Sequence, residues 1–372
     1  MSDRYHRQRL LPEIDQERLA ASSVLVLGAG ALGNEVLSHL AAAGVGNITV
    51  VDFDLVELTN LHRTLLFREE DIGKNKAVVA ARELRRLAPE LEVHAVEGDF
   101  RFAIGLGYFR AAGVVAGCLD SVEARAAAAQ LCALAGVPYI DGGTSGLIGE
   151  VRHYLPGEGP CYACAIGNEA RERLLARWSC AGLALTSVPE PERPALGATS
   201  GVIGSHQAMA VLLALLGRQE SWGFAHLYDG VRGRMEPVRL PRDPSCPNHE
   251  GPLPIAATFA GNVETTSAAE LDAAFGPLAG IRLRHTLVTF LSCADCGRRW
   301  EVFRPLAAFS PGDFVCPDCG QERTPETLVT LEPQHPWWSR PLDELALPPG
   351  EVVGLLDATE IRWLQLAFQE QK

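Results

Sequence analysis

Apolar runs and mixed, alanine-rich stretches alternate along the chain up to residue 150. Short runs rich in valine, isoleucine and leucine predict strands at residues 23–28, 47–52, 91–98, 113–120 and 137–143. Between them, apolar positions three and four residues apart predict helices at 34–44, 76–88 and 122–136. Strands that alternate with helices of this length form a doubly wound, Rossmann-like and mostly parallel sheet. The expected fold class is therefore α/β.

The pattern changes twice in the second half of the chain. Residues 168–200 contain Pro189, Pro191 and Pro194, which favour an extended, exposed crossover loop. A helix at 201–217 and a strand at 225–230 are then expected to return to the sheet. Residues 251–267 have the composition of a linker, so we expect two domains, 1–252 and 253–372. Strand-like alternation at 281–291, 299–303 and 327–333 predicts a smaller, β-rich C-terminal domain.

Hydropathy and charge narrow the environment of the protein. The most apolar stretch, 208–217, is too short to span a bilayer, so we expect a buried helix and no membrane anchor. The formal net charge of −13 argues against broad binding to nucleic acid or to an anionic membrane. The first ten residues are polar and basic and hold no apolar leader, so a cytoplasmic protein is expected.

The segment after the first strand predicts a nucleotide site. Gly28, Gly30 and Gly33 have the GxGxxG spacing of a tight turn that leads into a helix and approaches a phosphate closely. Alone, this pattern favours a dinucleotide of the NAD type, with Asp52 at the end of the next strand on a ribose hydroxyl. Asp120 and Asp141 also end strands, so we expect the three carboxylates to converge at one edge of the sheet.

Cationic residues beyond Asp52 favour ATP over NAD. Asn60, Arg63 and Lys76 follow this aspartate, whereas the pyrophosphate of NAD is largely satisfied by glycine amides and a helix dipole. A triphosphate carries more charge, which Arg, Lys and a metal ion must neutralise before the α-phosphorus can be attacked. Asp120 suits Mg²⁺, because this ion typically takes one or two carboxylates and phosphate oxygens. The alternative for Asp120 is a helix N-cap, and Arg63 and Lys76 taken singly resemble solvated charges.

Ten cysteines in a chain of this kind indicate metal binding or catalysis before disulfides. Cys293, Cys296, Cys316 and Cys319 have the spacing of a four-thiolate zinc ribbon. Cys161 and Cys164, together with the distant Cys246 and His249, have the composition of a second zinc site. The alternative for either set is a pair of reduced turns without a metal ion.

Eight short blocks resemble, in sequence order, the ThiF/MoeB/HesA superfamily, which includes ubiquitin-activating enzymes. They are RYHRQ (4–8), GAGALG (28–33), DFDLVELTNLHR (52–63), GKNK (73–76), CLDS (118–121), DGGTSG (141–146), CYAC (161–164) and GVIGSHQA (201–208). The resemblance implies a homodimeric adenylyltransferase that joins AMP to the C-terminal glycine of a ubiquitin-like protein. Thr64, Leu119 and His249 depart from the usual glutamine, threonine and cysteine of the family.

The resemblance also implies roles for individual residues. The nucleotide would lie against Gly28, Gly30, Gly33, Asp52, Asp54, Asn60, Arg63, Lys76 and Asp120. Within that set Asp52 would bind the ribose, Asn60, Arg63 and Lys76 the phosphates, and Asp120 the magnesium ion. Arg7 would reach the nucleotide of the opposite subunit. Cys161, Cys164, Cys246 and His249 would hold structural zinc.

The acyl adenylate needs an acceptor, and a thiolate is the natural one. Cys118 lies in a predicted strand and Cys132 in a predicted helix, where a buried hydrophobic role is expected. Cys180 lies in the proline-containing loop, near three arginines that favour its thiolate. It resembles the thioester-forming cysteine of ubiquitin-activating enzymes, and the alternative is an incidental loop cysteine.

Four hypotheses follow for the function of the chain. The first is a ubiquitin-like-protein activating enzyme that forms a thioester on Cys180, with residues 253–372 docking a conjugating enzyme. The second is a sulfur-carrier adenylyltransferase that serves thiamine, molybdopterin or thiolated-RNA synthesis. An NAD-dependent oxidoreductase and a non-catalytic zinc scaffold are the alternatives from other classes.

Overall fold

The computed structural model describes residues 4–157, 159–166, 194–218, 220–249, 251–357 and 360–368. These residues form two compact units, which are described separately. The first unit contains an eight-stranded sheet. The second contains a six-stranded sheet, together with the short segment Ile104–Gly107 from the first half of the chain.

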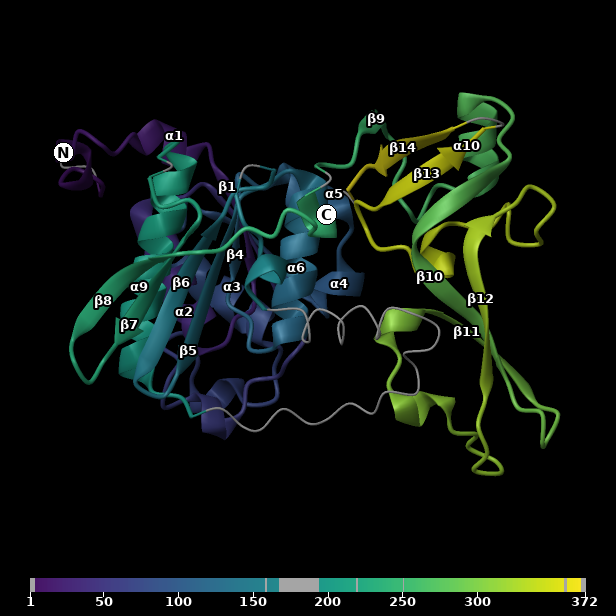
Figure 1. Cartoon of the computed structure of the whole chain (residues 1–372), viewed down its shortest axis with the longest axis horizontal. Helices are drawn as coiled ribbons and strands as arrows, with labels where there is room; N and C mark the ends of the chain where they lie inside the picture. Colours follow the sequence, from purple (N-terminus) through teal and green to yellow (C-terminus); the bar gives the residue numbers. More distant parts are fainter. Residues whose placement is uncertain are drawn as a thin grey trace. The chain divides into compact units, whose positions relative to one another are not determined.

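The sheet of the first unit is parallel over five strands and antiparallel over the last three (Figure 1). Its order is β3-β2-β1-β4-β5-β6-β7-β8. The strands are β1 (Ser23–Leu27), β2 (Asn47–Asp52), β3 (Glu92–Glu97), β4 (Val114–Gly117), β5 (Tyr139–Ser145), β6 (Ile148–Tyr154), β7 (Phe224–Asp229) and β8 (Arg234–Arg239). The predicted α/β class is confirmed, and β1 and β4 lie side by side, with β2 on the other edge of β1.

Helices of the first unit begin and end where local sequence dictates. They are α1 (Gln16–Ala20), α2 (Ala31–Ala43), α3 (Lys76–Leu87), α4 (Phe100–Ala103), α5 (Leu106–Ala111), α6 (Val122–Ala135), α7 (Tyr162–Ala165) and α9 (Gly197–Leu215), of which α5 begins within the Ile104–Gly107 segment of the second unit. The Asn75 side chain caps α3 by accepting from the amides of Ala77 and Val78. Gly44 and Gly136 end α2 and α6 in left-handed conformations.

By length and composition helix α9 is long and apolar enough to cross a membrane, and 56% of its most apolar stretch is buried inside the protein. Its Ile203, Val211 and Leu215 belong to the same hydrophobic core as Val26 of β1 and Val151 of β6. Burial on this scale is typical of the core helix of a globular unit. The expected buried helix therefore accounts for its apolar composition, and it begins four residues earlier than predicted.

Strand β9 (Ile255–Phe259) corrects the expected linker at 251–267, because it pairs in parallel with β14 (Ile361–Leu366). The order of the second sheet is β11-β10-β13-β14-β9, and β12 pairs with β10 off this path. Its other elements are α10 (Ala268–Phe275), β10 (Gly280–Ser292), β11 (Arg299–Pro305), β12 (Thr324–Leu331) and β13 (Val352–Leu356). The β-rich C-terminal region is thus confirmed, and β10, β11 and β12 match predicted strands.

A buried ion pair stabilises the second unit. The Arg284 Nε and Nη2 groups each donate to a Glu351 carboxylate oxygen at 2.9 Å. Burial alone would raise the pKa of Glu351, yet the Arg284 guanidinium holds this pKa below its usual value. The amide of Val352 also donates to the carboxylate at 2.8 Å. The carboxylate therefore stays ionised at neutral pH although its side chain is 2% exposed.

Candidate functional site

The three glycines of the turn after β1 differ in the space around them. Gly28 has φ +95°, and a Cβ there would lie 2.5 Å from the Cys118 carbonyl oxygen. A Cβ on Gly33 would lie 2.1 Å from the Gly28 carbonyl oxygen. Gly30 has φ −69°, and no atom lies within 4 Å of the position where its Cβ would be. Internal packing thus explains Gly28 and Gly33, whereas Gly30 leaves room for a ligand.

Asp52 at the end of β2 fixes this turn to the loop that follows. Its Oδ2 accepts from the Ala29 amide at 2.6 Å, and its Oδ1 accepts from the Asp54 amide at 2.8 Å. Burial raises the pKa of Asp52, and the two amide hydrogen bonds oppose that shift. Each carboxylate oxygen has a second lone pair, so the side chain retains the capacity to accept from two ribose hydroxyls.

Lys76 and Asp54 form an ion pair beside the turn. The Lys76 Nζ lies 2.7 Å from Asp54 Oδ2, and the lysine is 9% exposed. The Asn75 side chain donates to the carbonyl oxygens of Asp52 and Asp54 and thereby joins the start of α3 to the end of β2. The structure therefore brings together Asp52, Asp54, Lys76 and the glycine turn, as the sequence predicts for a nucleotide site.

Asn34 is a positioning residue that the sequence reasoning missed. Its amide nitrogen donates to the carbonyl oxygens of Ala29 at 2.7 Å and Gly30 at 3.0 Å. Its side-chain oxygen accepts from the Leu66 amide at 2.8 Å, and the residue is fully buried. Asn34 thus connects the glycine turn with the loop of residues 53–66. The signal available in the sequence was an asparagine directly after the GxGxxG turn.

Asn60 and Arg63 lie on that loop. The buried Asn60 side chain accepts from the Glu57 amide at 3.0 Å and so shapes the loop itself. The half-buried Arg63 donates from Nη1 to the Thr59 carbonyl oxygen at 2.7 Å, and its backbone lies near Gly197, where α9 begins. Thr64, at the position of the family's glutamine, donates to the Asn60 carbonyl oxygen.

The carboxylates at the strand ends separate into two environments. Asp120 is exposed and follows Cys118 and Leu119, the two residues after β4. The neighbouring Ser121 accepts from the Ala124 amide and caps α6, so the N-cap alternative for Asp120 is wrong. Asp141 is fully buried and pairs with Arg125 at 3.0 Å, so it is not accessible to a ligand, and the convergence of all three carboxylates stays a prediction. Arg125 also donates to the Leu119 carbonyl oxygen at 2.8 Å and thereby positions the residue before Asp120.

The first cysteine cluster lies in the same unit as the sheet. Cys161 Sγ lies 3.8 Å from Cys164 Sγ and 3.6 Å from Cys246 Sγ, while Cys164 Sγ lies 3.3 Å from His249 Nε2. Tetrahedral zinc with Zn–S bonds of about 2.3 Å places its sulfur ligands about 3.8 Å apart. The donor set and its spacing therefore fit a structural zinc ion, held by two segments 85 residues apart in sequence.

Comparison with known proteins identifies the family. The model of the ThiF family matches residues 4–248. The chain belongs to the ThiF family. It is 37% identical over 248 residues to mouse "Adenylyltransferase and sulfurtransferase MOCS3", a match that covers 65% of this chain and 51% of that protein. It is 35% identical over 254 residues to the "Sulfur carrier protein adenylyltransferase" of Thermus thermophilus, covering 66% of this chain and 89% of that one.

Solved structures agree with this fold. The crystal structure of E. coli MccB with ATP has a TM-score of 0.56 and 24% identity, and the match covers 67% of this chain and 74% of that chain. The structure of E. coli MccB with succinimide has the same TM-score and identity. The ThiF-family chain spans about half the length of the MOCS3 proteins that it matches.

The second cysteine cluster lies beyond the ThiF match, with one pair on the turn between β10 and β11 and the other on the turn that precedes β12. Cys293 Sγ lies 3.5 Å from Cys319 Sγ, and Cys296 Sγ lies 3.7 Å from Cys316 Sγ. All four sulfur atoms lie within 4.8 Å of one another. This arrangement has the donor set of the zinc ribbon that the spacing predicts.

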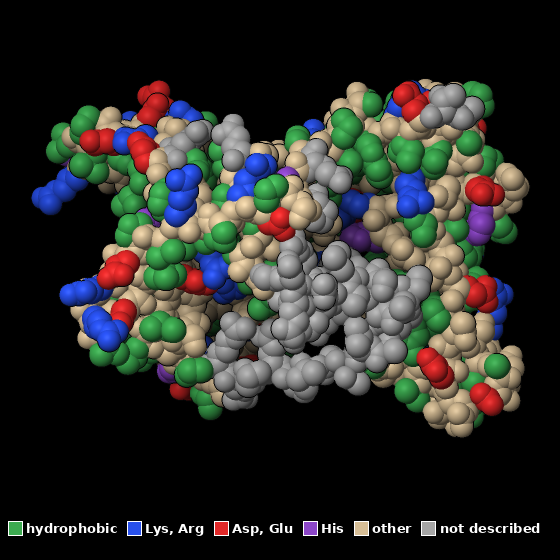
Figure 2. Space-filling view, in the orientation of Figure 1, with side chains coloured by type: hydrophobic (Ala, Val, Ile, Leu, Met, Phe, Trp, Pro, Cys, Tyr) green, Lys and Arg blue, Asp and Glu red, His purple; other side chains and the backbone are tan. Residues whose placement is uncertain are grey.

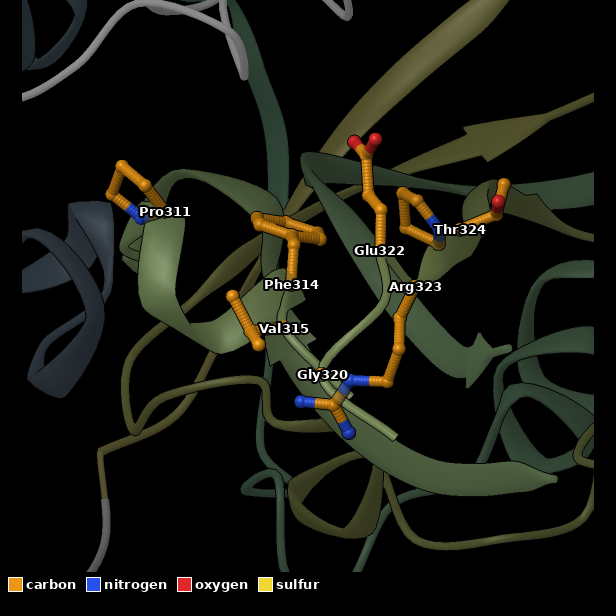
Figure 3. Close-up of a pocket in the computed structure, with 8 residues that line it drawn as sticks. Pro311, Phe314, Val315, Gly320, Glu322, Arg323 and Thr324 are labelled. Atoms are coloured by element: carbon orange, nitrogen blue, oxygen red, sulfur yellow. The ribbon is translucent and has the colours of Figure 1, made fainter. Parts of the chain in front are cut away.

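A pocket of about 350 Å³ lies beside this ribbon in the ThiF-family chain. Figure 3 shows Phe314 and Val315 at its centre, with the Glu322 and Arg323 side chains extending in opposite directions. Pro311, Gly320, Thr324 and Pro325 complete the lining. The lining is mixed in polarity, and all of it comes from residues 311–325 of the second unit.

The remaining predicted residues are Cys118, Cys132, Arg7 and Cys180. Burial raises the pKa of the Cys118 and Cys132 thiols well above the ordinary value, which suits the expected hydrophobic role and disfavours their thiolates. Arg7 is exposed near the start of the described chain. Cys180 and most of the expected crossover loop, residues 167–193, lie outside the described residues.

Proposed function

We propose that this chain uses Mg-ATP to adenylate the C-terminal glycine carboxylate of a small ubiquitin-like or sulfur-carrier protein. The observation that carries the proposal is the open space at Gly30, next to Asp52 and the Lys76–Asp54 pair. Gly28 and Gly33 are required by packing, whereas a side chain at Gly30 would block only an incoming group. Family membership and the fold shared with an ATP-bound MccB support a nucleotide in that space.

The residues present suit adenylation, because a carboxylate is already an anionic nucleophile at neutral pH. In the proposed step, a carboxylate oxygen bonds to the α-phosphorus, the bond to the bridging oxygen breaks, and pyrophosphate leaves with the electron pair. No proton has to be removed from the nucleophile, so catalysis consists of positioning and charge neutralisation. Asp52 orients the ribose, while Asn60, Arg63 and Lys76 bind the phosphates.

Magnesium and a second subunit complete the proposed site. Asp120 would hold the Mg²⁺ ion, and its exposure leaves its oxygens accessible to a hydrated cation. When bound, this ion supplies positive charge to the departing pyrophosphate. In a homodimer, Arg7 would reach the nucleotide of the opposite subunit, and its exposed position near the start of the chain is compatible with that role.

The acyl group has two candidate fates after adenylation. The names of the MOCS3 and Thermus relatives favour a sulfur carrier, whose product is a thiocarboxylate. The other route is a thioester, in which Cys180 Sγ bonds to the acyl carbon, AMP leaves and the thiol proton is lost. We propose the sulfur-carrier route as the first to be tested and the Cys180 thioester as the second.

In this proposal zinc has a structural role and the C-terminal unit docks a partner. Zinc in both cysteine clusters would stabilise the turns that carry them, and the reduced thiols suit the cytoplasm. Residues 253–372 would dock a partner such as a conjugating enzyme. On the described part of the face in Figure 2, acidic and basic side chains are interspersed, unlike the continuous basic strip of nucleic-acid-binding proteins.

ATP–pyrophosphate exchange with diglycine-ended carrier proteins tests the proposal. The native chain should exchange label only when carrier, ATP and magnesium are present, and Lys76→Met should lower the rate at least about 100-fold. Lys74→Met is the matched control, because this exposed lysine lies two residues away and pairs with Asp71. Equal rates in both variants, or turnover that requires NAD instead of ATP, would contradict the proposal.

The two acyl fates are separated by the same reaction without label. A covalent carrier adduct that reductant cleaves and Cys180→Ala abolishes indicates the thioester route. Carrier adenylate without an adduct, converted to an acyl disulfide on addition of a persulfide donor and then to thiocarboxylate by a thiol reductant, indicates the sulfur-carrier route. Mass spectrometry of the carrier distinguishes the two products directly.

A further inference from the structure

Three histidines from separate elements meet in the first unit, and none of them belongs to a cysteine cluster. They are His153 on β6, His206 on α9 and His226 on β7. One imidazole nitrogen from each lies within 4.8 Å of the others. β6 and β7 pair through Val151 and His226, so His153, two residues further along β6, lies diagonally on the same face as His226.

The position of α9 accounts for the third histidine. Ile203 of α9 packs directly over Gly149 of β6, where a Cβ would lie 2.4 Å from its Cγ1. His206 is one helical turn beyond Ile203 and lies over the next part of the same strand. His153 pairs with Ile140 near the start of β5, so the histidine cluster lies toward the edge of the sheet opposite the glycine turn.

Hydrogen bonding satisfies only part of this cluster. The His226 Nδ1 and His153 Nε2 atoms lie 3.2 Å apart, so one nitrogen donates to the other. The His206 Nε2 atom is buried and has no hydrogen-bond partner, although its ring centroid lies 4.9 Å from that of His226. A buried polar atom without a partner costs stability, so an additional group between the rings would satisfy it.

The chemistry of the cluster selects the additional group. Burial, reinforced by the two neighbouring imidazoles, lowers the pKa of His153 to about 3, and burial lowers the pKa values of His206 and His226. Neutral imidazoles present lone pairs, and a tetrahedral ion with Zn–N bonds of about 2.0 Å separates its nitrogen ligands by about 3.3 Å. The 3.2 Å separation observed matches this value.

We propose that His153, His206 and His226 bind a divalent transition-metal ion, with zinc as the best match to three imidazoles and an open fourth position. Within the described residues the cluster consists of imidazoles alone, so it selects against Mg²⁺ and Ca²⁺, which prefer oxygen ligands. The ion joins α9 to the antiparallel half of the sheet. This site is independent of the proposed nucleotide site and of both cysteine clusters.

Zinc content measured by mass spectrometry tests the site in the full-length protein. Native protein, loaded with zinc and passed through gel filtration in excess Mg²⁺, should contain one zinc ion per chain more than His206→Phe, which keeps a ring of similar size. The matched control is His39→Phe, since His39 also contacts α9, through Ser205, but lies outside the cluster. It should retain the native zinc content, and equal contents in native protein and His206→Phe would overturn the proposal.

Crystals of the zinc-loaded native protein provide a second test that needs no variant. Diffraction at the zinc absorption edge should show an anomalous peak about 2 Å from one nitrogen of each of the three imidazoles. A map with peaks at the cysteine clusters and none among the histidines would overturn the proposal. Neither measurement depends on ATP turnover, so the proposed adenylation can fail while this site stands, and the reverse.

Discussion

The substitution Gly30→Ala separates a ligand-binding role of the glycine turn from a structural one. Gly30 is the N-cap residue of α2, where replacing glycine by alanine costs roughly 1 kcal/mol of stability. No atom lies within 4 Å of the new methyl group, and φ of −69° is accessible to alanine. The variant should therefore fold with a free energy of unfolding within about 1 kcal/mol of the native value.

ATP binding should weaken although the variant stays folded. A methyl group directed into the space where a phosphate approaches the turn should raise the KM for ATP at least tenfold, or about 1.4 kcal/mol of binding free energy. The KM is measured by ATP–pyrophosphate exchange, and urea titration gives the free energy of unfolding. Gly28→Ala should instead lower the free energy of unfolding, because its methyl group would lie 2.5 Å from the Cys118 carbonyl oxygen and its φ would be +95°.

The matched control for Gly30→Ala is Gly312→Ala in the C-terminal unit. The nearest atom to its Cβ would be Ser310 Oγ at 4.0 Å, so this substitution also adds a methyl group without a clash. It should leave the KM for ATP unchanged. A folded Gly30→Ala variant that exchanges pyrophosphate with the native KM would refute the assignment of the open space to the nucleotide.

Three further outcomes are expected. Asn34→Ala should lower the free energy of unfolding by about 2–3 kcal/mol in urea titration, because it leaves the Leu66 amide without a partner, and unchanged stability would contradict this. Glu351→Gln should cost about 3 kcal/mol at pH 7, because it leaves Arg284 buried and uncompensated. The pKa of Glu351 is lowered in the folded state, so the native protein has its full stability difference from this variant above the unfolded pKa of roughly 4.3. That difference is lost as the pH falls through the lower folded pKa. A difference in the free energy of unfolding that is independent of pH between pH 7 and 3 would refute the ion pair. Chelation of zinc, or Cys246→Ser, should lower Tm in calorimetry, whereas a zinc-depleted chain with the native Tm would exclude a structural metal.

Local signals made the parallel half of the first unit predictable. The glycine turn, the strand after it and Asp52 occur within one continuous stretch, whose pattern is typical of a strand, a tight turn and a helix. The CxxC pairs were equally informative, because each turn presents two sulfur atoms by itself. What these signals have in common is that their geometry is fixed by residues a few positions apart.

The antiparallel half of that sheet was harder to predict. Strand β8 is exposed along most of its length and contains Pro237, which is tolerated there because β8 is an edge strand. Strand β6 carries Glu150, Arg152 and His153 in a stretch without clean alternation. Tertiary pairing overrides weak local preference in both cases, so neither strand has a sequence signature of its own.

Sequence position alone predicted neither the burial of the Asp141 carboxylate nor the clustering of the three histidines. Asp141 follows the same strand-end pattern as Asp52, but Arg125 from α6 compensates its charge inside the unit. The three histidines become neighbours only when α9 packs over β6 and β7. Such contacts depend on the register of distant elements, which a single sequence does not specify.

The ion pair between Lys76 and Asp54 has a consequence for nucleotide binding. The lysine is 9% exposed and its ammonium is already compensated at 2.7 Å, so a phosphate must compete with a carboxylate for it. A triphosphate carries more negative charge than the single phosphate of AMP, and both carry more than one carboxylate. In the proposed adenylation, the pair would favour ATP over AMP at this lysine and support release of AMP after the acyl group has been transferred. Asp54→Asn should narrow that preference, with the affinities for ATP and AMP, measured by calorimetry, moving closer together, and an unchanged ratio would show that the pair is not exchanged on binding.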